Sequence, residues 1–343
     1  MEEVKFFDAT LRDGSHAIKH QFTKQNIQDY CWNIDKAGMD AVIVGHGNGL
    51  GASSLQVGLS RLTDHEMLET AKKELKKTKL GVYMIPGFGT IEEDLLPAID
   101  IGAELFKIGC QCTEADTTKQ HISFLHRAGK EVYGVLMMYH MTTTERLLLE
   151  AQKMQGYGAN GVIIMDSAGA STPEMVKRTI STLKNGLNIE IGFHAHNNLG
   201  LAVSNTYVAL TEGATIVDGT IRGFGAGAGN CPLEVLVALL KKENWDMRQI
   251  DWYAMLDVSD NIVSKFSDNF KGLDSLSIVS GTAGVFSAFK EHVLKASKAF
   301  DVDARDIFLA LGEQKVMAGQ EDMIIDIAIR LKRKKAIDDS LSF

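Results

Sequence analysis

The feature that most constrains the fold is a regular alternation of short apolar segments with amphipathic ones. Apolar and β-branched residues cluster in short runs, and we expect strands at residues 4–10, 40–45, 80–85, 105–110, 131–138, 161–165, 190–195 and 216–221. Between these runs lie segments with helical periodicity, such as DHEMLETAKKELKK and STPEMVKRTISTLKNG. Strands that alternate with helices form right-handed βαβ units, so the sequence predicts a parallel sheet.

The number of units indicates how the sheet closes. Eight βα units in about 250 residues are typical of the (β/α)8 barrel, also called the TIM barrel. An open, doubly wound sheet is the alternative, but no G-x-G-x-x-G motif follows the first strand to favour it. After about residue 262 the pattern becomes helical and ends in the basic run RLKRKKAIDD, which we expect to be a solvated helix end. We therefore predict an α/β chain with a TIM-barrel domain at residues 1–262 and a smaller, mostly helical domain at residues 263–343.

Composition excludes several classes of partner. The 343-residue chain has a net charge of -8, which argues against nucleic acid or an anionic membrane as the main ligand. No apolar run is long enough to span a bilayer, and the N-terminus lacks the layout of a secretory signal. Four cysteines are too few for a disulfide framework in such a chain, so we expect a cytoplasmic protein. Cys110 and Cys112 are too closely spaced for the usual zinc site.

Polar residues follow most of the predicted strands at the position where barrel enzymes carry their active sites. The segments concerned are LRDGSH after the first strand, GHGNG after the second, QCTEAD after the fourth, MDSAGA after the sixth, FHAHNN at the seventh and RGFGAGAGN after the eighth. A single cluster of this kind could arise by chance. Six clusters on one face of a barrel predict a functional site there.

The HAH element of the seventh strand gives the most specific prediction. Residues two apart in a strand point the same way, so His194 and His196 project to one side. In a closed barrel the first strand follows the eighth and so lies close to the seventh. Asp13, just after the first strand, would then complete a site of two imidazoles and one carboxylate. Nitrogen and oxygen ligands of this kind accept Mn, Mg, Zn or Co. The alternative is that both histidines are ordinary polar residues at the barrel mouth.

Two further residues of the first cluster, and a histidine shortly after it, suit chemistry on an anion. Arg12 can stabilise a carboxylate or a developing enolate beside a divalent cation. His16 and His20 are four residues apart, so a short helical turn would place them on one face. One of them can act as a general base, because histidine titrates near neutral pH, and we expect this to be His16 with His20 in support. The alternative is that both histidines only form hydrogen bonds with the loop. The glycine-rich stretch at residues 223–230 either binds phosphate or packs tightly by the metal, with Asn230 supporting the ligands.

In combination these motifs resemble a known family. The stretches DATLRDGSHAIKHQFT, HGNGLGASS, MDSAGA, HAHNNLGLAVSN, GAGAGNCPLEV and GQEDMIIDIA are similar to those of the 4-hydroxy-2-oxovalerate aldolases. These enzymes are class II pyruvate aldolases of a metal-dependent superfamily that also contains isopropylmalate synthases and hydroxymethylglutaryl-CoA lyases. The resemblance covers almost the whole chain.

The resemblance implies both a reaction and a set of roles. It implies Mn2+, or else Mg2+, Co2+ or Zn2+, held by Asp13, His194 and His196. It implies that Arg12 stabilises a pyruvate enolate and that His16 is the base in a retro-aldol cleavage of a 4-hydroxy-2-oxo acid. It also implies a degradative role, as in aromatic hydrocarbon catabolism, and an acylating aldehyde dehydrogenase that docks on the helical domain. We also expect an oligomer.

Some positions depart from the family pattern. The family carries a motif like G-Y-A-G-V-Y whose first tyrosine reaches the substrate, whereas this chain has GTAGVF, with Thr282 and Phe286. On the third strand a leucine-rich stretch is replaced by VYMIPG, where we expect the Tyr83 hydroxyl to contact the substrate. With Arg12 and Tyr83, the substrate contacts are expected from Ser167 of the MDSAGA motif and from Thr282.

Two other functions remain open at this point. A Claisen-type acyl-CoA enzyme would use the same HAHNN motif, although the region after the barrel follows the aldolase pattern. A weakly active scaffold subunit for a dehydrogenase would explain the missing tyrosine, but the Arg12, Asp13 and His16 set argues for catalysis.

Overall fold

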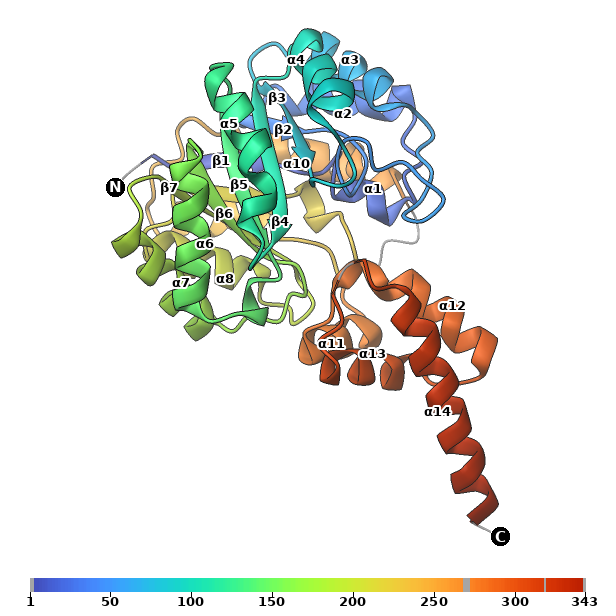
Figure 1. The fold of residues 1–343 in the computed structure, drawn as a ribbon. Helices are drawn as coiled ribbons and strands as arrows, with labels where there is room; N and C mark the ends of the chain where they lie inside the picture. The colour runs from blue at the N-terminus through green and yellow to red at the C-terminus, as the bar shows by residue number, and fades with distance from the viewer. Residues whose placement is uncertain (1–2, 268–271, 318, 342–343) are drawn as a thin grey trace.

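The sheet closes into a single barrel (Figure 1). The computed structural model describes residues 3–267, 272–317 and 319–341. Within these residues, eight parallel strands pair in sequence order, and the last strand pairs with the first. They are β1 (Lys5–Asp8), β2 (Ala41–Ile43), β3 (Lys79–Met84), β4 (Leu105–Gln111), β5 (Glu131–Met137), β6 (Gly161–Asp166), β7 (Glu190–Ala195) and β8 (Ile216–Gly219). Each overlaps a predicted strand, and the TIM barrel with a helical C-terminal region is confirmed.

Helices that follow the strands cover the outside of the barrel, and further helices form the C-terminal region. Over the described residues they are α1 (Gly14–Ala17), α2 (Lys24–Ile34), α3 (Asp64–Glu74), α4 (Leu96–Ile101), α5 (Lys119–Arg127), α6 (Thr144–Gly156), α7 (Pro173–Gly186), α8 (Ala202–Thr211), α9 (Leu233–Lys242), α10 (Trp252–Asn261), α11 (Ser275–Ala283), α12 (Lys290–Phe300), α13 (Ala304–Glu313) and α14 (Asp322–Leu341). Their starts are set by side-chain caps: Thr23 and Thr63 each form a reciprocal capping box with the residue three positions later. None of the helices in the described residues has the length and apolarity needed to cross a bilayer.

The first strand ends earlier than the sequence predicts, and this difference shapes the site. Residues 4–10 were expected to be extended, but β1 stops at Asp8. The buried Asp8 carboxylate accepts hydrogen bonds from the backbone N–H and the hydroxyl of Thr10, which turns the chain out of the sheet. The backbone N–H groups of Arg12 and Asp13 then both donate to the Ala9 carbonyl, at 3.0 and 2.7 Å. The turn places both side chains over the barrel mouth.

The C-terminal helices have their own core. Val285, Phe289, Val293, Ile307 and Phe308 are buried together with apolar residues of α14. Figure 1 shows α11 to α14 gathered beside the barrel, with α14 projecting away from it. The basic run was expected to be a helix end, but α14 continues to Leu341, and Lys332, Arg333 and Lys334 are exposed within it.

A buried amide joins the helical region to the barrel. Asn198, just after β7, donates to the Ser277 carbonyl at 3.2 Å and to the Ser280 hydroxyl at 2.8 Å. Its side-chain oxygen accepts a hydrogen bond from Ser287 at 2.9 Å. All the polar atoms of this side chain are therefore bonded, which fixes the helical region over the C-terminal ends of the strands.

Candidate active site

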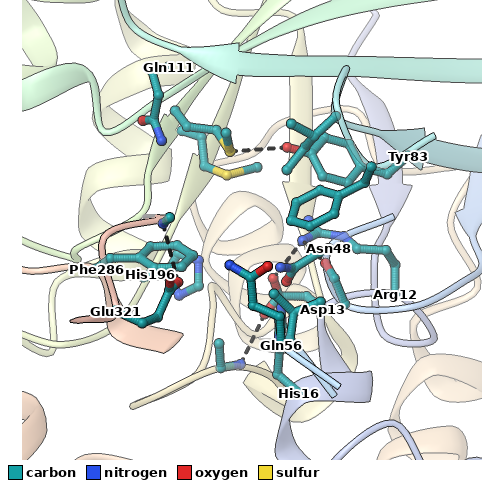
Figure 2. Close-up of a pocket in the computed structure, with 18 residues that line it drawn as sticks. Arg12, Asp13, His16, Asn48, Gln56, Tyr83, Gln111, His196, Phe286 and Glu321 are labelled. Carbon is teal, nitrogen blue, oxygen red and sulfur yellow. Dashed lines mark hydrogen bonds and ion pairs between the residues drawn. The ribbon is translucent and has the colours of Figure 1, made fainter. Parts of the chain in front are cut away.

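A cavity of about 150 Å³ opens at the C-terminal end of the barrel (Figure 2). Its polar lining comes from the ends of strands, from the loops that follow them and, through Glu321, from the helical region. The lining residues include Arg12, Asp13, His16, Asn48, Gln56, Tyr83, Gln111, His196 and Glu321, with apolar contributions from Val57, Ile85, Phe88, Met137, Met165 and Phe286. A concave site with convergent polar groups at this end of a barrel is where TIM-barrel enzymes carry out their chemistry.

Asp13, His194 and His196 come together as predicted. One potential ligand atom from each lies within 4.8 Å of the other two, and all three side chains are buried. His194 and His196 reach the same place because they are two residues apart at the end of β7. Among the described residues no other group of three His, Cys, Asp or Glu side chains is arranged in this way, and Cys110 and Cys112 belong to none.

The Asp13 carboxylate is held in place by neighbours on both oxygens. Oδ1 accepts hydrogen bonds from the Ala226 N–H at 3.0 Å and from Asn230 Nδ2 at 2.7 Å. Arg12 Nη1 donates to Oδ2 at 2.8 Å. Burial alone would raise the pKa of Asp13, but Arg12 and the nearby histidines hold it well below its usual value. The group is therefore a carboxylate at neutral pH.

The glycine-rich stretch forms the wall behind this carboxylate. Asn230 and His196 form an isolated antiparallel β-bridge through their backbones, and the Cys231 N–H donates to the Ala195 carbonyl at 2.9 Å. The loop therefore folds back against the end of β7. A Cβ at Gly225 would collide with Asn230 Nδ2 and Asp13 Oδ1. Of the two interpretations offered by the sequence, the geometry matches the tightly packed loop, which lies against Asp13 and His196.

His194 is oriented by a buried ion pair that the sequence analysis missed. Its Nδ1 lies 3.3 Å from Asp218 Oδ2, and the same carboxylate oxygen contacts Lys107 Nζ. Lys107 and Asp218 are fully buried inside the barrel. Burial would raise the pKa of Asp218, but Lys107 and His194 keep it below its usual value. A carboxylate behind an imidazole directs the other ring nitrogen outward, as is common behind metal ligands.

The residues present fit a divalent cation. His194 Nε2 and His196 Nδ1 are buried atoms with no hydrogen-bond partner. Burial lowers the pKa of His196 to about 3, so its ring is neutral and can act as a ligand. Buried polar groups are normally satisfied, and two unpartnered imidazole nitrogens beside a buried carboxylate therefore indicate a site for a cation.

Arg12 presents unused donors to the same cavity. Its Nη1 donates to Asp13 and, at 3.3 Å, to the Gly47 carbonyl. Nε and Nη2 are buried and have no partner. Two free N–H-bearing nitrogens of a buried guanidinium can receive an oxyanion of a ligand.

The three histidines of the first two loops form one cluster. The rings of His20 and His46 are stacked with centroids 3.6 Å apart, and the His16 ring packs edge-on against His20 at 5.1 Å. Burial lowers the pKa of His20 to about 2 and that of His46 to about 4, so both rings are neutral. His16 is the member that lines the cavity, and burial lowers its pKa as well. A neutral imidazole at this position can accept a proton.

Three of the predicted substrate contacts differ from expectation. Ser167 is buried after β6, where its hydroxyl accepts from the Met138 N–H at 3.2 Å, and it does not line the cavity. Thr282 is exposed on α11 and donates to the Ile278 carbonyl, so the prediction for this side chain is wrong. Phe286 is the residue of the GTAGVF motif that lines the cavity. The Tyr83 hydroxyl donates to the Met137 sulfur at 3.1 Å, and the face of its ring lies 4.8 Å from Arg12 Cζ.

No role was predicted for Gln56, Glu321, Lys107 or Asp218. Lys107 and Asp218 carried a usable signal, since each is a charged residue within an otherwise apolar strand, LFKIGC or IVDGTI. Gln56 carried none, because it reaches the cavity through a loop. Glu321 lies in the stretch GQEDMIIDIA, which resembles the family, but its place at the cavity depends on the docking of the helical region.

Comparison with known proteins identifies the family of both parts of the chain. Residues 3–262 match the HMGL-like family and residues 271–333 match the DmpG-like communication domain. The chain is 50% identical to a 4-hydroxy-2-oxovalerate aldolase of Pectobacterium atrosepticum, covering 97% of both chains. It is 48% identical to 4-hydroxy-2-oxovalerate aldolase 2 of Salinispora arenicola, covering 98% of this chain and 97% of that one.

A solved structure shares the fold. The carboxyl transferase domain of pyruvate carboxylase from Rhizobium etli has a TM-score of 0.76 and covers 98% of this chain and 61% of that one. At 15% identity this likeness concerns the fold alone. The family matches and the two close relatives are more specific. The chain belongs to the 4-hydroxy-2-oxovalerate aldolases, carbon–carbon lyases with an HMGL-like barrel.

Proposed function

We propose that the protein is a divalent-metal-dependent aldolase that cleaves a 4-hydroxy-2-oxo acid, such as 4-hydroxy-2-oxovalerate, into pyruvate and an aldehyde. The observation that carries the proposal is the convergence of Asp13, His194 and His196 beside the free donors of Arg12. The names of the close relatives support the same substrate class.

The metal would be held by Asp13, His194 and His196, with Asn230 and Asp218 orienting the ligands. When bound, a divalent cation supplies Lewis-acid polarisation of the 2-oxo acid and stabilises negative charge on its oxygens. We propose Mn2+ first, with Mg2+, Co2+ and Zn2+ as alternatives that the same ligands would accept.

The remaining steps belong to side chains of the chain itself. Arg12 Nε and Nη2 would donate hydrogen bonds to the oxyanion of the substrate and of the developing enolate. His16 would take the proton from the 4-hydroxyl, directly or through water. The oxygen's electron pair then forms the aldehyde C=O, the C3–C4 bond breaks, and its electrons move into the pyruvate enolate. Return of this proton from His16 to C3, directly or through water, completes pyruvate and regenerates the neutral imidazole.

The cavity lining suggests how the aldehyde half is accommodated. Met137, Met165 and Phe286 provide apolar surface, and Gln111 presents an amide whose oxygen is buried without a partner. Phe286 brings no hydroxyl to this wall. We propose that the shape of this wall, rather than a phenolic hydrogen bond from the helical region, limits the length of the aldehyde.

The two parts of the chain would have different tasks. We propose that residues 1–262 carry the chemistry and that residues 263–343 dock an acylating aldehyde dehydrogenase, in line with the communication-domain match. An oligomeric, cytoplasmic enzyme is part of the same proposal.

The test is pyruvate release from a panel of 4-hydroxy-2-oxo acids of increasing chain length. Metal-stripped protein should be inactive, addition of Mn2+ should restore cleavage, and His16→Ala should reduce kcat by at least about a hundredfold. Absence of cleavage by metal-loaded protein, together with absence of exchange of the pyruvate methyl protons, would refute the proposal. Coenzyme A release from an acyl-CoA and a 2-oxo acid would favour a Claisen enzyme. An unchanged rate in His16→Ala would argue for another base or for a scaffold role.

A further inference from the structure

An aromatic ring lies directly against the arginine of the proposed active site. Tyr83 projects from β3 into the barrel, and Arg12 Cζ lies 4.8 Å from the centre of its ring. The side chains are almost completely buried, with Tyr83 2% and Arg12 3% exposed. Figure 2 shows the two side by side at one end of the cavity. A guanidinium stacked on an aromatic face in a desolvated site is held more strongly than one at the surface.

Arg12 needs such support because its hydrogen bonds restrain only one of its nitrogens. Nη1 donates to Asp13 Oδ2 and to the Gly47 carbonyl, whereas Nε and Nη2 have no partner. A planar group tethered through one nitrogen can still rotate about that contact. The Tyr83 ring, 4.8 Å from Arg12 Cζ, lies where it can oppose this rotation.

Tyr83 is itself held at its far end. Its hydroxyl donates to the Met137 sulfur at 3.1 Å and occupies the space next to residue 109 on β4. A Cβ at residue 109 would collide with this hydroxyl, so the glycine is what allows the ring to lie where it does. Because the hydroxyl is already engaged with Met137, the ring is the part of Tyr83 that faces Arg12.

We propose that Tyr83 is a positioning residue that fixes the plane of Arg12, so that Nε and Nη2 point toward the oxyanion of the 2-oxo acid. The inference rests on the proposed aldolase function and replaces the substrate contact expected for the Tyr83 hydroxyl. Gly109 belongs to the same device, since it makes room for the ring.

The test compares Tyr83→Phe, Tyr83→Leu, Gly109→Ala and the double variant Gly109→Ala/Tyr83→Leu in the Mn2+-loaded protein. Three quantities are measured: kcat and KM for 4-hydroxy-2-oxovalerate, the Kd of pyruvate, and the Kd of Mn2+. Tyr83→Leu should raise KM and the pyruvate Kd by about tenfold, the range expected for a buried cation–π contact. The Mn2+ Kd should change by less than about threefold, because Asp13 keeps its bonds to Ala226 and Asn230.

The conservative variant and the glycine variant separate the ring from other causes. Tyr83→Phe keeps the ring and should recover most of the affinity lost in Tyr83→Leu. Gly109→Ala should weaken pyruvate binding in the same direction, and adding Tyr83→Leu to it should produce little further loss, because both changes act through one ring. Tyr133→Leu serves as the control for loss of a buried barrel tyrosine, since Tyr133 contacts Lys5, Glu131 and Glu190 away from the cavity.

Each alternative outcome is distinct. A loss in Tyr83→Phe as large as that in Tyr83→Leu would overturn the inference in favour of direct substrate binding by the hydroxyl. Unchanged pyruvate affinity in Tyr83→Leu would show that the ring does not position Arg12. An equal loss of Mn2+ affinity, or the same change in Tyr133→Leu, would indicate general damage to the barrel and also overturn the inference. Failure of the wild-type protein to cleave any substrate would instead refute the proposed function, while the pyruvate titration would still test the role of the ring.

Discussion

The buried pair of Lys107 and Asp218 gives the sharpest prediction about stability. Both side chains are fully buried, and the carboxylate also faces His194. Lys107→Met keeps a similar volume but leaves the carboxylate buried without its cation. Removing one partner of a buried ion pair destabilises a protein by about 3–5 kcal/mol, because the remaining charge is uncompensated. We expect a loss of this size in the free energy of unfolding.

Urea denaturation at pH 7 measures the change, with the midpoint and slope compared between variants. The double variant Lys107→Met/Asp218→Asn removes both charges and should recover at least half of the loss. The matched control is Lys72→Met, which breaks the Lys72–Glu104 pair at 2.7 Å, with side chains 36% and 48% exposed. Exposed pairs contribute about 0–1 kcal/mol, so this control should be nearly neutral. A Lys107→Met protein no less stable than Lys72→Met would refute the reasoning.

Two more predictions concern the proposed metal site and its surroundings. Gly225→Ala should weaken Mn2+ binding by at least about tenfold in a calorimetric titration, because the new methyl group would push on Asn230 and Asp13. The control is Gly156→Ala, which has open space around the new methyl group and should leave Mn2+ affinity unchanged. Equal Mn2+ affinities in the two variants would contradict the packing of Gly225 against Asn230 and Asp13. His46 is buried, and its folded pKa of about 4 lies below the usual value of about 6.5, so the unfolded chain binds the proton first as pH falls. The free energy of unfolding should therefore fall as the pH is lowered from about 6.5 to 4. Urea titrations at several pH values should show a shallower decline for His46→Gln, with the exposed His65→Gln as the control. An unchanged pH dependence in His46→Gln, or the same change in His65→Gln, would be inconsistent with a neutral buried His46 ring.

Much of the fold, and the grouping of Asp13, His194 and His196, could be predicted from local patterns. Short apolar runs marked every strand, because a parallel barrel strand is buried on both faces and needs continuous apolar residues. The two-residue spacing of His194 and His196 predicts that both side chains project to the same side, since alternate strand residues share a face. Asp13 followed because strands one and eight pair in a closed barrel, which brings the first loop near β7.

Other parts of the site depended on three-dimensional packing that the sequence pattern does not encode. The choice between Thr282 and Phe286 is set by where α11 ends and how the helical region docks through Asn198. The direction of the Tyr83 hydroxyl depends on the absence of a side chain at residue 109, on a different strand. Such relations between distant residues are properties of the assembled barrel.

The most direct measurement is an equilibrium titration of metal-stripped protein with Mn2+. Binding of one ion per chain is predicted for the wild-type protein, and loss of that binding is predicted for the double variant His194→Ala/His196→Ala, which removes both imidazoles of the site. Absence of binding in the wild-type protein, or equal affinity and stoichiometry in the double variant, would contradict the assignment of Asp13, His194 and His196 as the metal ligands.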